Sequence, residues 1–472
     1  MKAIRSNRNV SPHGGIVPIL KKIKEFGIPQ VIRGCLGKRV AQSTYSYEDI
    51  LIAWVLTSLC GGTRLDHITK MKKKLSIIPG LKLPSHDTLG RGMKKLATEV
   101  VMKESVKGRG SNLGIHVNHY NDNGKMNNLL IKASKRIGAL QEGRLYTLHI
   151  DATFIETNCV TSNCNNEGKK YGFYPMICLI DNMPVYISMR NGDSNAEFQI
   201  KECLEQCLNL LAENKIRVHN VISDSAGYNK SLIDMLHSRG VKFNIHMPFN
   251  TMFKTMLNQI DNCDNWKKVE LKTAYNIREC EIGEIKYKMH ESQNVNRIIV
   301  ARIPNKNTIK SFESIEEKER RKMIEIKMKG LSDRKLLKGE GRAYKLGKWK
   351  PYKKYNLKLI ITNDWKKTPE ELIVEYNKRG DAERQFDAMK NDFGWRFPPF
   401  MNMNENTVFM IAAALANNVL RGILNVFKKK LPELRLNTRL RDFQFIFIDV
   451  ACEYINNTFI FYNTDMAYEK IM

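Results

Sequence analysis

The sequence predicts an α/β protein in which a mixed sheet flanked by helices follows an N-terminal helical domain. Three observations predict it. Residues 1–140 favour helices, residues 141–247 alternate between β-rich runs and amphipathic helices, and residues 248–365 contain short β-like runs around a charged stretch. The 472 residues suffice for two to four domains. We therefore divide the chain into segments 1–140, 141–247, 248–365, 366–430 and 431–472.

In the N-terminal segment the sequence predicts three successive helices. Ser46 and Asp49 are typical of a helix start, and Gly61-Gly62 ends that helix after Leu59. A second helix is expected from Thr63 to Lys74, and Pro84-Ser85 precedes a third that carries the basic residues Arg91, Lys94 and Lys95. Two helices joined by a glycine turn and followed by a basic helix suit docking into the major groove of DNA. A plain helical bundle with a basic face is the alternative.

The central segment predicts the order β-β-β-α-β-α-β. Asp181-Asn182 is a turn signal between two apolar runs, and Ser194 with Glu197 fits a capping box. The expected elements are strand Tyr146–Ile155, hairpin strands Tyr171–Leu179 and Val185–Met189, a helix with Cys203 and Cys207 on its apolar stripe, strand Val218–Ser223, a helix over 229–238, and strand Val241–His246.

The last third predicts a β-rich insertion and then helices. Thr368 with Glu371 forms another capping box, from which we expect one helix to about Phe393. A long helix is expected from Asn406 to Lys430, before a mixed C-terminal tail. The insertion strands are expected at Val269–Leu271, Glu284–Met289, Arg297–Arg302 and Leu357–Thr362.

The charge of the chain indicates a polyanionic partner. Lys and Arg total 77 against 49 Asp and Glu, a net charge of +28, and residues 1–110 alone hold 21 basic against seven acidic residues. This excess favours nucleic acid. Lys327–Lys354 interleaves basic residues with aromatics that include Trp349, which suits stacking on unpaired bases. A solvated basic loop is the alternative for that segment.

Other features exclude competing classes. The most apolar run, Val408–Ala416, has nine residues, whereas a membrane span needs about 20. The first residues show no secretory signal, and the ten cysteines are irregularly spaced, as expected of reduced thiols in a cytosol.

Three carboxylates stand out as candidate metal ligands. Asp151 lies in a strand among apolar neighbours, Asp224 follows a buried strand, and Glu383 lies in the helix that begins near Thr368. An ionised acid resists burial unless it is paired or binds a metal. Carboxylate oxygens suit Mg²⁺, and two such ions serve phosphoryl transfer.

One predicted helix carries Tyr376, Arg379, Glu383 and Lys390 at relative positions 0, 3, 7 and 14. At about 100° per residue they occupy one narrow stripe. An acid, two cations and a phenol on one helix face can bind a metal ion and a phosphate together. A surface stripe with Arg379–Glu383 pairing is the alternative.

These four residues match the Y-(2)-R-(3)-E-(6)-K signature of the insertion-sequence-4 superfamily of DDE transposases, and the chain most resembles its IS1380-like branch. HIDATFIET around Asp151 and VISDSAGY around Asp224 resemble the two Asp regions of that family. The resemblance covers about residues 45–430. It implies an RNase H-like catalytic core interrupted by a β-rich insertion subdomain.

The resemblance also implies roles. Asp151, Asp224 and Glu383 would be catalytic and bind two Mg²⁺ ions, with Mn²⁺ as a substitute. Tyr376, Arg379 and Lys390 would contact DNA phosphates. Trp349 is the candidate for a base contact.

The partners implied are double-stranded DNA, as terminal inverted repeats and as target, and a second copy of the chain on paired ends. The resemblance implies cut-and-paste transposition by a bacterial, cytoplasmic, nucleoid-associated protein, with no membrane. Two alternatives remain: a nuclease of the same fold that lacks strand transfer, and a catalytically inactive DNA-binding repressor.

Overall fold

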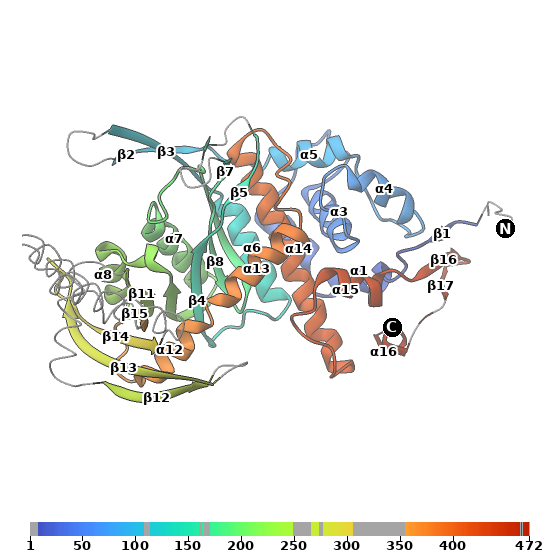
Figure 1. Cartoon of the computed structure of the whole chain (residues 1–472). Helices are drawn as coiled ribbons and strands as arrows, with labels where there is room; N and C mark the ends of the chain where they lie inside the picture. The colour runs from blue at the N-terminus through green and yellow to red at the C-terminus, as the bar shows by residue number, and fades with distance from the viewer. Residues whose placement is uncertain are drawn as a thin grey trace, which may run out of the picture. The chain divides into compact units, whose positions relative to one another are not determined.

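The computed structural model describes residues 8–107, 114–159, 163–164, 170–248, 266–272, 277–304, 355–462, 464 and 466–471. The chain divides into two compact units. The first contains Met1–Val221 and Gly380–Met472, and the second contains Ile222–Arg379. The second unit therefore interrupts the first in sequence. Figure 1 labels the elements of both.

The first unit begins with helices. Ser46 and Asp49 form a capping box at the start of α3, and Ser85 caps α5, as the sequence predicts. The helix expected from Thr63 instead begins at His67. The helices are α1 (Ile16–Glu25), α2 (Ile28–Leu36), α3 (Tyr47–Leu59), α4 (His67–Lys74), α5 (His86–Lys94) and α6 (Gly124–Arg136).

The prediction of helices throughout residues 1–140 is wrong for residues 101–107 and 114–122. Strands β2 (Val101–Lys107) and β3 (Gly114–Asp122) pair with each other in antiparallel fashion. The end of β3 pairs with β9 (Met183–Arg190) over Tyr120–Asp122. This pairing joins segments some 70 residues apart, so local sequence pattern does not reveal it.

The strand order in the first unit is β10-β4-β8-β9-β3-β2. β4 spans Leu145–Ala152, β8 spans Met176–Ile180, and β10 spans Arg217–Ser223, where the first unit gives way to the second. β4 pairs with β8 in antiparallel fashion, and β8 pairs with β9 in the same way. Asp181 and Asn182 adopt φ of 48° and 61°, so they form the tight hairpin turn that the sequence predicts.

Helices cover both faces of this sheet. Ile177 and Leu179 of β8 belong to the same buried cluster as the apolar residues of α14 (Met403–Lys430) and α6. The alternate residue Cys178 faces the thiols of Cys203 and Cys207 on α7 (Ile200–Glu213). Because successive side chains of a strand point to opposite faces, α14 and α6 pack on one face of the sheet and α7 packs on the other. The predicted capping box at Ser194 is wrong, because α7 starts after Gln199.

Helix α14 is the core helix of the first unit. Among the described residues it alone is long and apolar enough to cross a membrane, but 94% of its apolar window is buried inside the protein. It packs against α3, α6 and β9. Within it, the buried Asn418 amide donates to Ser134 Oγ at 3.0 Å and to the Pro184 carbonyl at 2.8 Å. Such burial is typical of a globular core.

The two ends of the chain meet in a small sheet. β1 (Val10–Ser11) pairs with β16 (Ala451–Ile455), which pairs with β17 (Thr458–Tyr462). Nearby, His13 Nδ1 lies 2.8 Å from Asp449 Oδ1, and Lys74 Nζ lies 3.1 Å from His13 Nε2. The remaining elements of this unit are β5 (Ile155–Glu156), β6 (Asn163–Cys164), β7 (Tyr171–Phe173), α13 (Gly380–Asn391), α15 (Leu440–Phe443), η2 (Gln444–Ile448) and α16 (Met466–Ile471).

The second unit has the strand order β12-β13-β14-β15-β11-β10. The four strands expected of the insertion are present, but they continue the sheet of β11 and do not form a separate one: Ile361 of β15 pairs with Ile245 of β11 and with Ile298 of β14. The bounds are η1 (Ser225–Gly227), α8 (Lys230–Ser238), β11 (Lys242–His246), β12 (Lys267–Lys272), β13 (Ile277–Lys288), β14 (Val295–Pro304), β15 (Tyr355–Thr362) and α12 (Pro369–Asn377).

Helix α12 closes the core of the second unit. Thr368 and Glu371 form its predicted capping box. Its Leu372, Ile373 and Tyr376 are buried in a cluster with residues of β10, β13, β14 and β15. The single helix expected to reach Phe393 is wrong, because Lys378 and Arg379 form a turn and α13 begins at Gly380.

Candidate active site

Asp151 lies near the end of β4 in the first unit. The β4 side chains alternate between buried and less buried positions, and this leaves Asp151 half-buried next to the buried Ile150. Its backbone pairs with Ile177 of β8. Its Oδ1 accepts the Ala152 N–H at 2.8 Å. The strand therefore holds this carboxylate at a defined position that solvent still reaches.

Lys390 of α13 binds the chain just beyond Asp151. Its Nζ donates to the Thr153 hydroxyl at 2.7 Å. Burial lowers the pKa of Lys390, the charge of Arg396 lowers it further, and Asp387 opposes this. The Lys390 ammonium is thus fixed at Thr153, which follows the end of β4 and lies two residues after Asp151.

Glu383 lies on the same face of α13 as Lys390. Seven residues separate them, which is about 10 Å along the axis and an offset of about 20°. The Glu383 side chain is exposed and lies in the first turn of the helix, where the helix dipole favours a negative charge. The first unit therefore contributes an acid and a cation from one stripe of α13.

Asp224 directly follows β10 in the second unit. It caps η1, because its Oδ1 accepts the Ala226 N–H at 3.0 Å. The turn is tight: a Cβ on Gly227 would lie 2.5 Å from Ser223 Oγ. The half-buried Asp224 carboxylate is consequently held at the end of its strand.

His246, at the end of β11, has charged neighbours that include Asp224. Burial lowers the pKa of its imidazole, the charges of Lys358 and Arg379 lower it further, and Asp224 acts in the opposite direction. The His246 ring also lies 6.2 Å from the Tyr376 ring, centroid to centroid. Lys358 Nζ lies 4.8 Å from the centre of that same ring. The second unit thus gathers one acid, two cations, a phenol and an imidazole.

The sequence profile described as “Transposase DDE domain group 1” matches residues 2–313, well over half of the 472-residue chain. The chain belongs to this family. The match includes Asp151 and Asp224 and ends before Glu383.

A cryo-EM structure of the piggyBac transposase synaptic complex with hairpin DNA is similar at 10% sequence identity, with a TM-score of 0.40. It covers 90% of this chain and 78% of that chain. No curated protein matches the sequence.

The four residues of the predicted signature are divided between the two units. Tyr376 ends α12 and Arg379 lies in the turn after it, whereas Glu383 and Lys390 lie in α13. The prediction of one stripe on one helix is therefore wrong for the first two residues and holds for the last two. Arg379 and Tyr376 are placed with Asp224, and Lys390 with the end of β4.

No three His, Cys, Asp or Glu side chains of the described residues form a group that could hold a metal ion. Arg91, Lys94 and Lys95 are exposed at the C-terminal end of α5, and Trp349 is outside the described residues.

Sequence reasoning missed four residues beside the predicted ones in this transposase. His246 and Lys358 accompany Asp224, Tyr376 and Arg379 in the second unit, and Thr153 and Arg396 accompany Lys390 in the first. The sequence did contain a signal for His246, because this residue is the last of a predicted strand, and Asp224 directly follows another predicted strand. Thr153 and Lys358 depend on contacts between separate segments, and Arg396, six residues after Lys390, is not marked by any sequence pattern.

Proposed function

We propose that this protein is a DNA transposase that binds terminal inverted repeats, cleaves the DNA next to them and joins the freed strand to target DNA by cut-and-paste. The observation that carries the proposal is membership of the DDE transposase family together with Asp151 in β4 and Asp224 directly after β10. Side chains that follow sheet strands are held on a rigid scaffold, as catalytic groups require.

The finer assignment rests on the signature residues. Tyr376, Arg379, Glu383 and Lys390 keep the spacing of the insertion-sequence-4 superfamily, and we place the chain in its IS1380-like branch. A mixed sheet with helices on both faces supports an RNase H-like core. The strands β12–β15 are the sequence insertion of that core.

The donor chemistry of the three acids suits Mg²⁺. Asp151, Asp224 and Glu383 offer hard oxygen ligands, and the two aspartates are half-buried at strand ends. These residues would hold the two metal ions of a transposase. When bound, such ions supply positive charge that activates the attacking oxygen and stabilises the leaving one.

The cations of the chain would hold the DNA. Arg379 would offer a guanidinium to a phosphate, and the buried Tyr376, which like Arg379 lies near His246, would offer its phenol. Lys390 is kept beside the end of β4 by Thr153, so it contributes a positioned charge there. The net charge of +28 attracts DNA at long range. We expect the active form on paired transposon ends to be a homodimer.

The test is incubation of the full-length protein with Mg²⁺ and linear DNA that carries the inverted repeats flanking its gene. Joined products support the transposase. Cut products without joining identify a nuclease, and binding without cutting identifies a repressor.

A variant pair makes this test specific to the site. We expect Asp224→Asn to retain end binding and to lose cleavage. Asp181→Asn is the matched control, because it removes the same charge at an exposed turn whose positive φ asparagine tolerates. Cleavage by Asp224→Asn at the rate of the control would reject the proposed role.

A further inference from the structure

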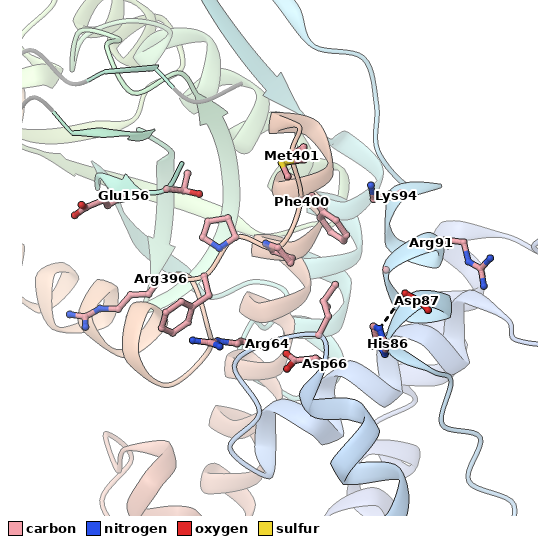
Figure 2. A pocket seen from close by; sticks show the side chains of 16 residues that line it. Arg64, Asp66, His86, Asp87, Arg91, Lys94, Glu156, Arg396, Phe400 and Met401 are labelled. Atoms are coloured by element: carbon pink, nitrogen blue, oxygen red, sulfur yellow. Dashed lines mark ion pairs between the residues drawn. The ribbon is translucent and has the colours of Figure 1, made fainter. Parts of the chain in front are cut away.

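The first unit contains a pocket of about 850 Å³ lined by four segments, at residues 64–66, 86–94, 156–157 and 396–401. Arg64 precedes α4, Arg91 and Lys94 lie on α5, and Arg396 follows α13. Figure 2 shows these basic side chains around the pocket on separate elements, with Arg396 and Arg91 on opposite sides of it. Apolar contact surface comes from the chain after Arg396, where the Phe397 side chain is 43% exposed and that of Met401 is 61% exposed.

The segment that carries Phe397 is anchored on both sides. Before it, the Trp395 side chain is fully buried, and its indole N–H donates to the Met410 carbonyl at 3.2 Å. After it, the Phe400 N–H donates to Asn406 Oδ1 at 3.0 Å, and Pro398-Pro399 restricts the backbone in between. An exposed aromatic ring is therefore presented by a rigid support.

Three of the four basic side chains of the pocket have no ion pair. Arg64, Arg91 and Arg396 form none with any residue in the described part of the chain, whereas Lys94 lies 3.3 Å from Glu405. The lining also contains three acids, Asp66, Asp87 and Glu156, of which Glu156 is paired with a lysine. His86 lies 3.3 Å from Asp87, the pair that Figure 2 marks, and Lys170 lies 2.7 Å from Glu156.

One arginine is stacked on the exposed ring. The Arg64 guanidinium carbon lies 4.6 Å from the centre of the Phe397 ring. A guanidinium on one aromatic ring gives a flat surface with a charge beside it. This combination suits a nucleotide, whose base stacks and whose phosphate is anionic.

The pocket also adjoins the candidate active site. Arg396 lies close enough to Lys390 for its charge to affect that ammonium, and Lys390 binds Thr153 beside the end of β4. A DNA strand with a phosphate at Lys390 can therefore continue past Arg396 toward Phe397.

We propose that this pocket binds unpaired nucleotides of the DNA strand next to the cleavage position, with a base against Phe397 and phosphates on Arg64, Arg91 and Arg396. The inference rests on the proposed transposase function and adds a single-stranded contact to it. Duplex DNA alone is the competing occupant. It offers phosphates but keeps its bases stacked inside the helix, so it would place no base against Phe397.

The experiment measures binding of the full-length protein to two fluorescent DNAs by anisotropy. One is a blunt duplex of arbitrary sequence, and the other is the same duplex with a short thymidine overhang. We compare the wild type with Phe397→Ala and Arg64→Ala. The matched control is Phe445→Ala, which truncates a phenylalanine that is 81% exposed in η2 and does not line the pocket.

We expect the wild type to bind the overhang DNA more tightly than the blunt duplex. Phe397→Ala is expected to weaken overhang binding by roughly tenfold, as for the loss of one stacked base, with little effect on the blunt duplex. Arg64→Ala is expected to weaken overhang binding and to reduce its dependence on salt.

Equal binding of both DNAs by the wild type, or equal effects of Phe397→Ala and Phe445→Ala, would overturn the inference. So would a loss by Phe397→Ala that is equal for both DNAs, because the occupant would then be duplex. A wild type that binds neither DNA would instead refute the proposed function itself. The two failures are therefore distinguishable.

Discussion

Gly394→Ala is the most informative test of the packing that supports the pocket. Gly394 adopts a φ of +82°, and a Cβ there would lie 2.3 Å from the Thr63 carbonyl oxygen and 3.1 Å from its carbon. The positive φ costs about 1–2 kcal/mol in an L-residue. Pushing two backbones apart costs a further ~1–3 kcal/mol. The sum predicts a loss of about 2–5 kcal/mol in the free energy of unfolding.

Two other glycines separate the contributions. Gly138 has a φ of +77° with nothing within 4 Å of a Cβ, so Gly138→Ala reports the backbone cost alone. Gly34, in α2, has open space and an ordinary φ, so Gly34→Ala is expected to be neutral or stabilising by up to about 1 kcal/mol.

Urea unfolding of the four proteins, followed by circular dichroism, gives the ranking. We expect Gly394→Ala to be the least stable, then Gly138→Ala, then the wild type and Gly34→Ala. If Gly394→Ala loses no more stability than Gly138→Ala, the close approach of Gly394 to Thr63 is refuted.

Three further predictions follow. Burial, and then the charge of Lys74, lower the pKa of His13 below its ordinary 6.5. Below about pH 6.5 the unfolded chain therefore binds more protons than the folded chain, so the free energy of unfolding falls as the pH drops. We expect His13→Gln to flatten the pH dependence of urea unfolding, whereas His290→Gln, at a highly exposed site, should leave it unchanged. Asn418→Ala should cost about 2–4 kcal/mol in the same assay, because it leaves a cavity and two buried groups without their donor, whereas the exposed Lys429→Ala should be neutral. DNA affinity, measured by anisotropy, should fall steeply with added salt; a flat response would contradict the role of the net charge.

Local signals predicted the elements whose ends are set by nearby residues. The Ser46 and Thr368 capping boxes and the Asp181-Asn182 turn occur where expected. Each needs only contacts within three residues, which sequence pattern encodes. Asp151 within a strand and Asp224 directly after one were predictable for a similar reason, because an acid that interrupts or ends an apolar run is visible in one sequence. The strand expected to reach Ile155 ends at Ala152, however, so the position of Asp151 near a strand end was not predicted.

Two errors have different causes, one long-range and one local. β2 and β3 were missed because β3 depends on pairing with β9. The helix break at Lys378–Arg379 had a signal that was not used, namely Gly380, whose low helix propensity costs about 1 kcal/mol in a helix interior. The break matters for the site, because it assigns Tyr376 and Glu383 to different helices.

Two of the missed site residues are basic. Lys358 reaches the Tyr376 ring through the fold, whereas Arg396 lies six residues after Lys390 and no pattern marks it. Basic residues are common in a chain with 77 of them, so composition cannot single these out.

The central claim is that Asp151, Asp224 and Glu383 act together on one set of metal ions. Electron paramagnetic resonance of Mn²⁺, titrated into the full-length protein bound to its terminal-repeat DNA, tests this most directly. We predict that Asp151→Asn, Asp224→Asn and Glu383→Gln each abolish tight Mn²⁺ binding, while Asp181→Asn binds as the wild type does. Unchanged Mn²⁺ binding in any one of the three variants would contradict the claim.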